Sequence, residues 1–140
     1  MHPAQPITLQ LDVHGIDWPA LIELFRLTHL AGRQGEKIRR AFEKSSVVCF
    51  AHEGSKLIGA ARALSDFEYH ATIYDVVVHP DYQGRAVGTR IMNALLGALP
   101  VWRVLLIADG KLSRFYERLG FEPYGDAWAR LDRNRLYDPA

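Results

Sequence analysis

The spacing of apolar residues along the chain alternates between the period typical of strands and the period typical of helices. Residues 7–13 alternate strictly between apolar and polar, which predicts a half-buried strand. Residues 17–30 place apolar side chains at helical spacing behind Asp17, a candidate N-cap, and residues 36–44 predict a shorter, more charged helix. The first third of the chain therefore predicts one strand followed by two helices.

A meander of strands is predicted next. Residues 46–51 and 56–64 have the composition of two paired strands, and the turn between them contains Gly54. Residues 72–78 are dense in β-branched side chains and stop just before Pro80, which cannot donate a ladder hydrogen bond. Because the connections between these strands are short, we expect them to pair antiparallel.

A glycine-containing turn and a helix follow this strand. The apolar period changes to that of an amphipathic helix over residues 86–99. Gly84 precedes this helix and Gly88 lies in its first turn. Such a turn directs backbone N–H groups and the positive end of a helix dipole at one point, where an anion such as a phosphate fits. Glycines in strand-to-helix turns are also common for purely steric reasons, so the spacing alone leaves both interpretations open.

The last third predicts one more strand, a short helix and a hairpin. Residues 101–108 are apolar except for Arg103, which predicts a buried strand parallel to residues 72–78 through the intervening helix. Residues 113–119 predict a helix that ends at Gly120. Residues 121–124 and 127–131 predict a last hairpin, whose free edge a second copy of the chain can pair with to form a homodimer.

Together these elements predict an α/β (α+β) fold in a single domain over residues 1–140. The central sheet is mixed and mostly antiparallel, with one parallel strand pair, and helices flank it. A net charge of +1 gives no support for a nucleic-acid partner. The single cysteine, Cys49, lies in an apolar run and is more readily explained as a buried thiol than as a nucleophile. We expect no metal site, no membrane span and a cytoplasmic location.

Two blocks of sequence resemble the Gcn5-related N-acetyltransferases. Residues 76–88 read Val-Val-Val-His-Pro-Asp-Tyr-Gln-Gly-Arg-Ala-Val-Gly, which resembles that family's Gln/Arg-x-x-Gly-x-Gly/Ala signature after a strand. Residues 115–121, Phe-Tyr-Glu-Arg-Leu-Gly-Phe, resemble its second hallmark. Ala86 stands where the family usually has glycine, and a positive φ at this residue would be strained. Residues 64–66 with 72–78 also resemble the branch of small-amine and plastid-type acetyltransferases.

The resemblance implies acetyl-CoA as cofactor, with its pantetheine arm between two splayed strands, residues 72–78 and 101–108. Backbone groups of Val76 and Val78 would bind the arm, and N–H groups from Gln83 to Thr89 would bind the pyrophosphate. The expected cofactor-binding residues are Val76, Val77, Val78, Gln83, Gly84, Arg85, Ala86, Val87, Gly88, Thr89, Ser113 and Tyr116.

The resemblance also implies candidates for proton transfer. Tyr116 matches the family's tyrosine that faces the thioester sulfur and is the expected general acid. Asp109 is the first candidate for the general base and Asp75 the second, and deprotonation through water without a dedicated base stays open. Phe25, His29 and Phe42 are candidates for substrate contact, although core packing explains each of them better when taken singly.

The favoured function is therefore an acetyl-CoA-dependent N-acetyltransferase that acts on a primary amine of a small molecule by direct attack in a ternary complex. A protein or peptide acetyltransferase, acting on lysine or an N-terminus, is the first alternative. The second alternative is a non-catalytic regulatory module that binds CoA.

Overall fold

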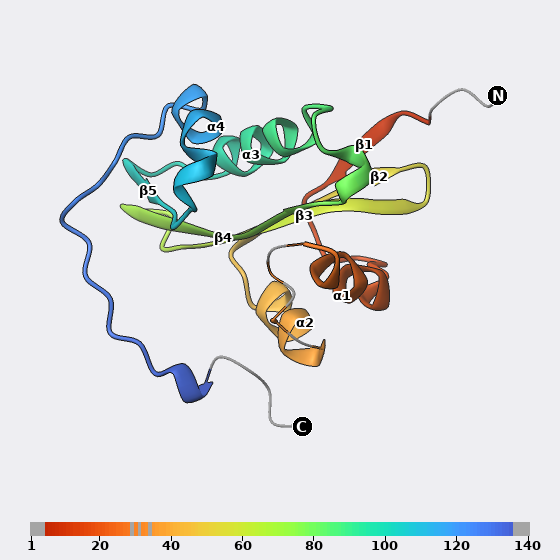
Figure 1. Ribbon diagram of the computed structural model, residues 1–140, viewed down its shortest axis with the longest axis horizontal. Helices are drawn as coiled ribbons and strands as arrows, with labels where there is room; N and C mark the ends of the chain where they lie inside the picture. Colours follow the sequence, from red (N-terminus) through yellow and green to blue (C-terminus); the bar gives the residue numbers. More distant parts are fainter. Residues whose placement is uncertain (1–4, 29, 31, 34, 136–140) are drawn as a thin grey trace.

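The fold is a five-stranded mixed sheet with helices on both faces (Figure 1). The computed structural model describes residues 5–28, 30, 32–33 and 35–135. The strands run in sheet order β1-β2-β3-β4-β5 and comprise Ile7–Gln10, Val47–Glu53, Lys56–Ser65, His70–Val78 and Arg103–Leu105. Neighbouring strands pair antiparallel except β4 and β5, which are parallel. The predicted fold class and the meander are thereby confirmed.

Two pairs of helices cover the two faces of the sheet (Figure 1). Helices α1 (Trp18–Arg26) and α2 (Gly35–Glu43) lie on one face, while α3 (Val87–Gly97) and α4 (Ser113–Arg118) lie on the other. Each face has its own apolar core, and alternate residues of the strands supply the two cores, as the period of a strand requires. No helix in the described part of the chain is both long and apolar enough to cross a membrane.

Helix α1 begins and packs as its sequence predicts. Asp17 Oδ1 accepts a hydrogen bond from the Ala20 amide at 3.1 Å, which confirms it as the N-cap. The helix ends at Arg26, earlier than the expected Leu30. Phe25 and Phe42 are fully buried and meet edge to face, so core packing accounts for both side chains. His29 lies outside the described residues.

A β-bulge interrupts β4 in the middle of the sheet. Ala60 pairs with Val77 and Arg62 with Tyr74, so Asp75 and Val76 together lie opposite a single residue of β3. Asp75 has φ of 59°, in the left-handed region that aspartate tolerates better than most residues. The bulge brings the Asp75 side chain to Arg62 and to Arg33, which precedes α2.

The C-terminal part of the chain differs from the prediction. Strand β5 contains residues 103–105 in place of 101–108, and its side chains are half-buried instead of buried. The hairpin expected at residues 121–131 is wrong, because this segment contains no strand. Trp128 is 98% exposed and Leu131 63% exposed, so neither of these apolar side chains packs against a surface that would stabilise a hairpin. Within the described residues the outer strands of the sheet are β1 and β5, and a homodimer stays a prediction.

Candidate functional site

The strands β4 and β5 pair only where both begin. Residues 70–72 of β4 pair with residues 103–105 of β5, and the described chain offers β4 no partner on this side beyond Thr72. The expectation that the two strands pair at their beginnings and then splay is confirmed. The His79 amide donates to Ile58 O of β3 at 2.7 Å, so alternation directs the backbone groups of Val78 away from β3, to the open side.

A sharp turn connects the open edge of β4 to helix α3. Residues 80–82 form a single 3-10 turn capped by His79, whose Nδ1 accepts from the Asp81 amide at 3.1 Å. Gly84 follows with φ of 81°. Gln83 Nε2 donates to Val78 O at 3.3 Å, which shows that this carbonyl is available to donors outside the sheet ladder.

Ala86 is the N-cap of α3 and adopts φ of 62° and ψ of 16°, the left-handed conformation. A residue with a Cβ is strained there by about 1 to 2 kcal/mol. Because Ala86 supplies no side-chain cap, the amides of the first turn of α3 are left without a capping partner from this residue. Val87 is buried, whereas Gly88 and Thr89 are half-buried. The N–H groups of residues 87–89 lie at the positive end of the dipole of α3.

Three of the expected cofactor-binding elements meet at Gly88. A Cβ added to Gly88 would lie 3.3 Å from Phe115 Cζ and 3.7 Å from Val78 Cγ2. The start of α3, the end of β4 and helix α4 are therefore in contact at this residue. Val76 and Val78 direct their side chains to this face, whereas Val77 is buried on the opposite face among α1 and α2.

Tyr116 lies on α4, packed between two aromatic rings. Its ring meets Phe115 at 4.9 Å and Phe121 at 5.8 Å between centroids, both edge to face. The side chain is half-buried, and burial raises the pKa of its phenol above the ordinary value. Tyr116 is therefore protonated throughout the physiological range, as a proton donor must be. Gly120, with φ of 91°, ends the helix as expected.

The other expected residues of the site occupy less enclosed positions. Asp109 is exposed, and its Oδ1 accepts from the Lys111 amide at 2.8 Å, so it caps the 3-10 turn Gly110–Leu112 that leads into α4. Ser113 is the exposed first residue of α4. Arg85 lies over the ring of Tyr82, with 5.0 Å between Cζ and the ring centroid.

Asp75 lies on the opposite face of the sheet, between Arg33 and Arg62. Arg62 Nε donates to Asp75 Oδ2 at 2.6 Å, and Arg33 Nη1 lies 2.5 Å from Asp75 Oδ1. Only 4% of the Asp75 side chain is exposed. Both carboxylate oxygens thus face guanidinium groups, so the carboxylate is engaged from two sides by charged partners.

The arginines on this face were not singled out from the sequence. The available signal was Arg62, a charged residue inside the apolar run of β3, because a charge in a buried strand needs a partner. Its partner Asp75 is brought opposite by the β-bulge, which the apolar pattern does not reveal. The described residues contain no cluster of three or more His, Cys, Asp or Glu side chains suited to a metal ion.

The open strand edge and the turn fit the CoA moiety of acetyl-CoA. The splayed β4 offers backbone groups to an extended arm, as an added strand would use them. The uncapped start of α3 offers N–H donors to a pyrophosphate, and the absence of a side chain at Gly84 leaves the approach open.

Residues 44–123 match the family model described as the acetyltransferase (GNAT) domain. The chain belongs to the GNAT acetyltransferases. A GNAT-family acetyltransferase from Streptococcus pneumoniae superposes with a TM-score of 0.78 at 24% identity, covering 93% of this chain and 99% of the other. At that level of identity the likeness establishes that the GNAT fold is shared.

Two curated relatives of this GNAT protein carry different substrate names. Serotonin N-acetyltransferase 2, chloroplastic, from Oryza sativa subsp. japonica is 37% identical over 120 residues, 81% of this chain and 60% of its own length. Histone acetyltransferase TAP1 from Glycine max is 36% identical over 100 residues, 61% of this chain and 43% of its own length. The GNAT chain therefore spans less than two thirds of these relatives.

Proposed function

We propose that this acetyltransferase uses acetyl-CoA to acetylate a primary amine of a small molecule by direct attack in a ternary complex. The observation that carries the proposal is the meeting of β4, α3 and α4 at Gly88. It brings the open strand edge, the helix start and the helix of Tyr116 to one place. When bound, acetyl-CoA supplies the acetyl group as a thioester.

The protein's own part in the reaction is to bind, orient and move protons. Backbone groups of Val76 and Val78 hold the arm, and the N–H groups at the start of α3 hold the pyrophosphate. Tyr116 Oη keeps its proton at neutral pH, because burial raises its pKa, and donates that proton to the departing sulfur.

An alkylammonium must lose a proton before it can attack, because its pKa is near ~10.4. Asp109 is the base that we propose, since its carboxylate is exposed and Oδ1 is bound by a single amide of its own turn. Asp75 is less suited, because both of its oxygens face guanidinium groups.

Calorimetric titration of the full chain with acetyl-CoA and CoA tests the cofactor. Thiol release over aromatic amines, aliphatic amines, amino sugars and lysine peptides tests the acceptor. We expect micromolar binding and turnover on a small amine. Turnover only on lysine peptides would favour the protein acetyltransferase, the function for which the soybean relative is named. No binding of either form of CoA would overturn the proposal.

The variant Tyr116→Phe separates an enzyme from a non-catalytic CoA-binding module. We expect a loss of turnover of about 100-fold or more with unchanged CoA affinity, since general acid catalysis contributes that much. The control is Tyr69→Phe, because Tyr69 is 65% exposed and has no proposed role. Equal turnover of the two variants would remove Tyr116 from the mechanism.

A further inference from the structure

A cavity of about 260 Å³ lies on the α2 face of the sheet, beside the bulge of β4. Its lining combines two apolar side chains, Ile38 and Ala41, with a concentration of charged groups. The charged residues of the lining are Arg33, Lys37, Arg62, Arg135 and Asp75. The Arg135 guanidinium is 86% exposed and pairs with Asp132, so it is neutralised outside the cavity. Three cationic side chains, Arg33, Lys37 and Arg62, therefore face one carboxylate, and the local charge is positive.

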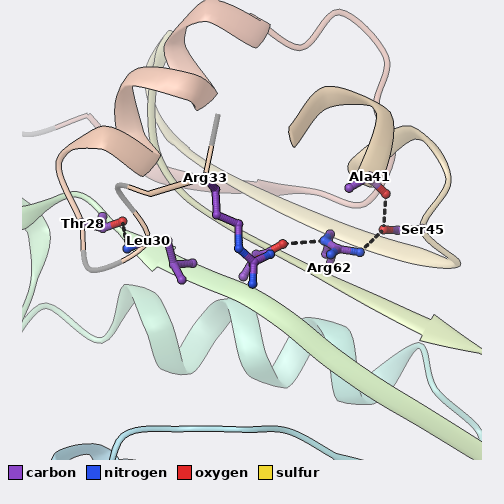
Figure 2. Close-up of polar contacts among 7 residues, drawn as sticks. Thr28, Leu30, Arg33, Ala41, Ser45 and Arg62 are labelled. Atoms are coloured by element: carbon purple, nitrogen blue, oxygen red, sulfur yellow. Dashed lines mark hydrogen bonds and ion pairs between the residues drawn. The ribbon is translucent and has the colours of Figure 1, made fainter. Parts of the chain in front are cut away.

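The buried part of this cluster is rigid. Arg62 is held by Asp75 and by Ser45, whose Oγ accepts from Arg62 Nη1 at 3.4 Å (Figure 2). Its guanidinium also lies over the ring of Tyr74, 5.1 Å from the centroid. The side chain of Arg62 is only 12% exposed, so its direction is fixed before any ligand arrives.

The outer part of the cluster is accessible to a ligand. The side chain of Arg33 is 37% exposed, and Lys37 is exposed on the first turns of α2. Lys37 Nζ donates to the carbonyl oxygen of Arg135 at 2.7 Å, a neutral acceptor that leaves the ammonium charge uncompensated. Because one carboxylate is shared between two guanidinium groups, the cavity keeps an excess of positive charge.

The cavity lies where an acceptor would approach. Asp75 lines it and directly precedes Val76, the residue proposed to hold the cofactor's arm. The cofactor's phosphates would lie at the start of α3, on the other face of the sheet. An acceptor that approaches from the α2 face, opposite the phosphates, would pass this cluster.

We propose that the cavity binds an anionic group, a carboxylate or a phosphate monoester, on the amine that the enzyme acetylates. This inference rests on the proposed function. Arg33 and Lys37 bind the anion, Arg62 positions Asp75 and Arg33, and Ile38 with Ala41 contact the apolar part of the acceptor. The acceptor class is thus an amino acid or an amino phosphate, and not a simple alkylamine.

Matched pairs of amines test this specificity with the full chain and acetyl-CoA. The pairs are tryptophan with tryptamine, and O-phosphoethanolamine with ethanolamine. We expect kcat/KM for at least one anionic member to exceed that of its partner by 10-fold or more. Which anionic member is preferred distinguishes a carboxylate from a phosphate. Equal or better turnover of both members that lack the anionic group, tryptamine and ethanolamine, would overturn the inference and leave the proposed function intact.

The variant Lys37→Gln tests the cluster without touching the contacts of Asp75. We expect it to raise KM for the preferred acceptor with an anionic group about 5-fold or more, with no change in KM for acetyl-CoA or for the partner that lacks the anionic group. The matched control is Lys44→Gln, a lysine just beyond the same helix and outside the lining. Equal effects of the two substitutions, or an equal effect on both members of a pair, would overturn the inference.

A binding measurement keeps the two proposals separable if no amine is turned over. The CoA-saturated chain is titrated calorimetrically with O-phosphoethanolamine and with tryptophan. Binding that weakens 5-fold or more in Lys37→Gln, but not in Lys44→Gln, would support the anion site even though the proposed activity fails. No binding of either anionic ligand would overturn it.

Discussion

Gly88 of α3 lies so close to Phe115 of α4 that a single methyl group would fill the gap between them, 3.3 Å from the ring. This contact joins the two blocks of sequence that carry the resemblance to the acetyltransferases. It explains why a glycine is needed here, although its backbone has no positive φ. The position of Tyr116, one residue beyond Phe115, therefore depends on the start of α3.

Gly88→Ala is expected to weaken acetyl-CoA binding more than it weakens the fold. Phe115 can move by a few tenths of an ångström, so we expect a loss of about 1 kcal/mol or less in the free energy of unfolding. The displaced ring shifts α4 relative to β4, and we expect Kd for acetyl-CoA to rise about 10-fold. Thermal unfolding and calorimetric titration measure the two effects.

Gly97→Ala is the control for this substitution, because it lies on the same helix with nothing within 4 Å of the added Cβ. Alanine there is expected to preserve affinity and to leave stability unchanged or raise it by up to ~1 kcal/mol. If both variants bind acetyl-CoA alike, the contact between Gly88 and Phe115 does not position the site.

Ala86→Gly is expected to stabilise the protein. The left-handed conformation costs alanine about 1 to 2 kcal/mol, whereas glycine adopts it freely. Glycine also loses more chain entropy on folding, by about 0.4 to 1 kcal/mol, which leaves a net gain of about 0.5 kcal/mol. The reciprocal change is Gly84→Ala, at φ of 81° with open space around it, and we expect it to destabilise by about 1 kcal/mol.

Chemical denaturation of the two variants checks this prediction. The dependence of the unfolding free energy on denaturant (the m-value) should be the same as in the parent, which shows that two-state unfolding is unchanged. A lower stability for Ala86→Gly would mean that the methyl group makes a stabilising contact that outweighs its backbone strain.

The ion pair of Arg62 with Asp75 and that of Arg26 with Glu23 have the same length, 2.6 Å, but differ in burial. The Asp75 side chain is 4% exposed and that of Glu23 is 54% exposed. Arg62→Gln is expected to destabilise by about 3 kcal/mol, because it leaves a buried carboxylate with one partner fewer. Arg26→Gln is expected to cost about 0.5 kcal/mol or less, because water screens an exposed pair.

Denaturation in low and high salt measures the loss of stability in each of these two variants. Only the small contribution of the Arg26 pair is expected to depend strongly on salt. Similar losses of unfolding free energy in the two variants would show that burial does not determine how much each ion pair stabilises the protein.

Cys49 is fully buried, and burial raises the pKa of its thiol to about 11. The thiolate is the reactive form, so the folded protein is expected to resist alkylation at pH 8. A thiol reagent should label Cys49 at the rate at which the protein unfolds, and denaturant should accelerate labelling to the rate of a free thiol. Rapid labelling of the folded protein would contradict this burial and would reopen the role of the residue as a nucleophile.

A structural feature can be predicted from the sequence when residues close together in the chain determine it. The strand, glycine turn and helix around Gly84 are set by neighbouring residues, and the sequence predicted them. The pairing of Asp75 with Arg62 and Arg33 depends on a bulge and on residues distant in the chain, so periodicity could not reveal it. The false hairpin at residues 121–131 shows the converse, since alternation predicts a strand only where a surface exists to bury one face.

The candidate site likewise combines parts that neighbouring residues determine with parts that distant residues determine. The cofactor contacts expected at residues 76–89 use backbone groups, so a short signature marks them. The left-handed conformation of Ala86 was foreseen only as a condition under which that residue would be strained. The lining of the α2 cavity comes from four separate segments, and only the fold brings Arg33, Lys37 and Arg62 together.

The raised pKa of Tyr116 gives the enzyme a pH profile of defined shape. The phenol must be protonated to act as an acid, and burial raises its pKa above the ordinary value of 10.0. The rate should therefore rise with pH as more of the acceptor amine becomes neutral. At pH values up to about 10 it should show no decline, because the phenol stays protonated. Tyr116→Phe should lower kcat about 100-fold or more and keep the rising limb, whereas Tyr69→Phe should leave the whole profile unchanged. Initial rates between pH 6 and pH 10 measure this profile.

The contrary outcome is a decline in rate near pH 8 that disappears in Tyr116→Phe. It would show that the pKa of the phenol is lowered. Hydrogen bonds or positive charge around the phenol, and not burial, would then be the dominant influence on its pKa.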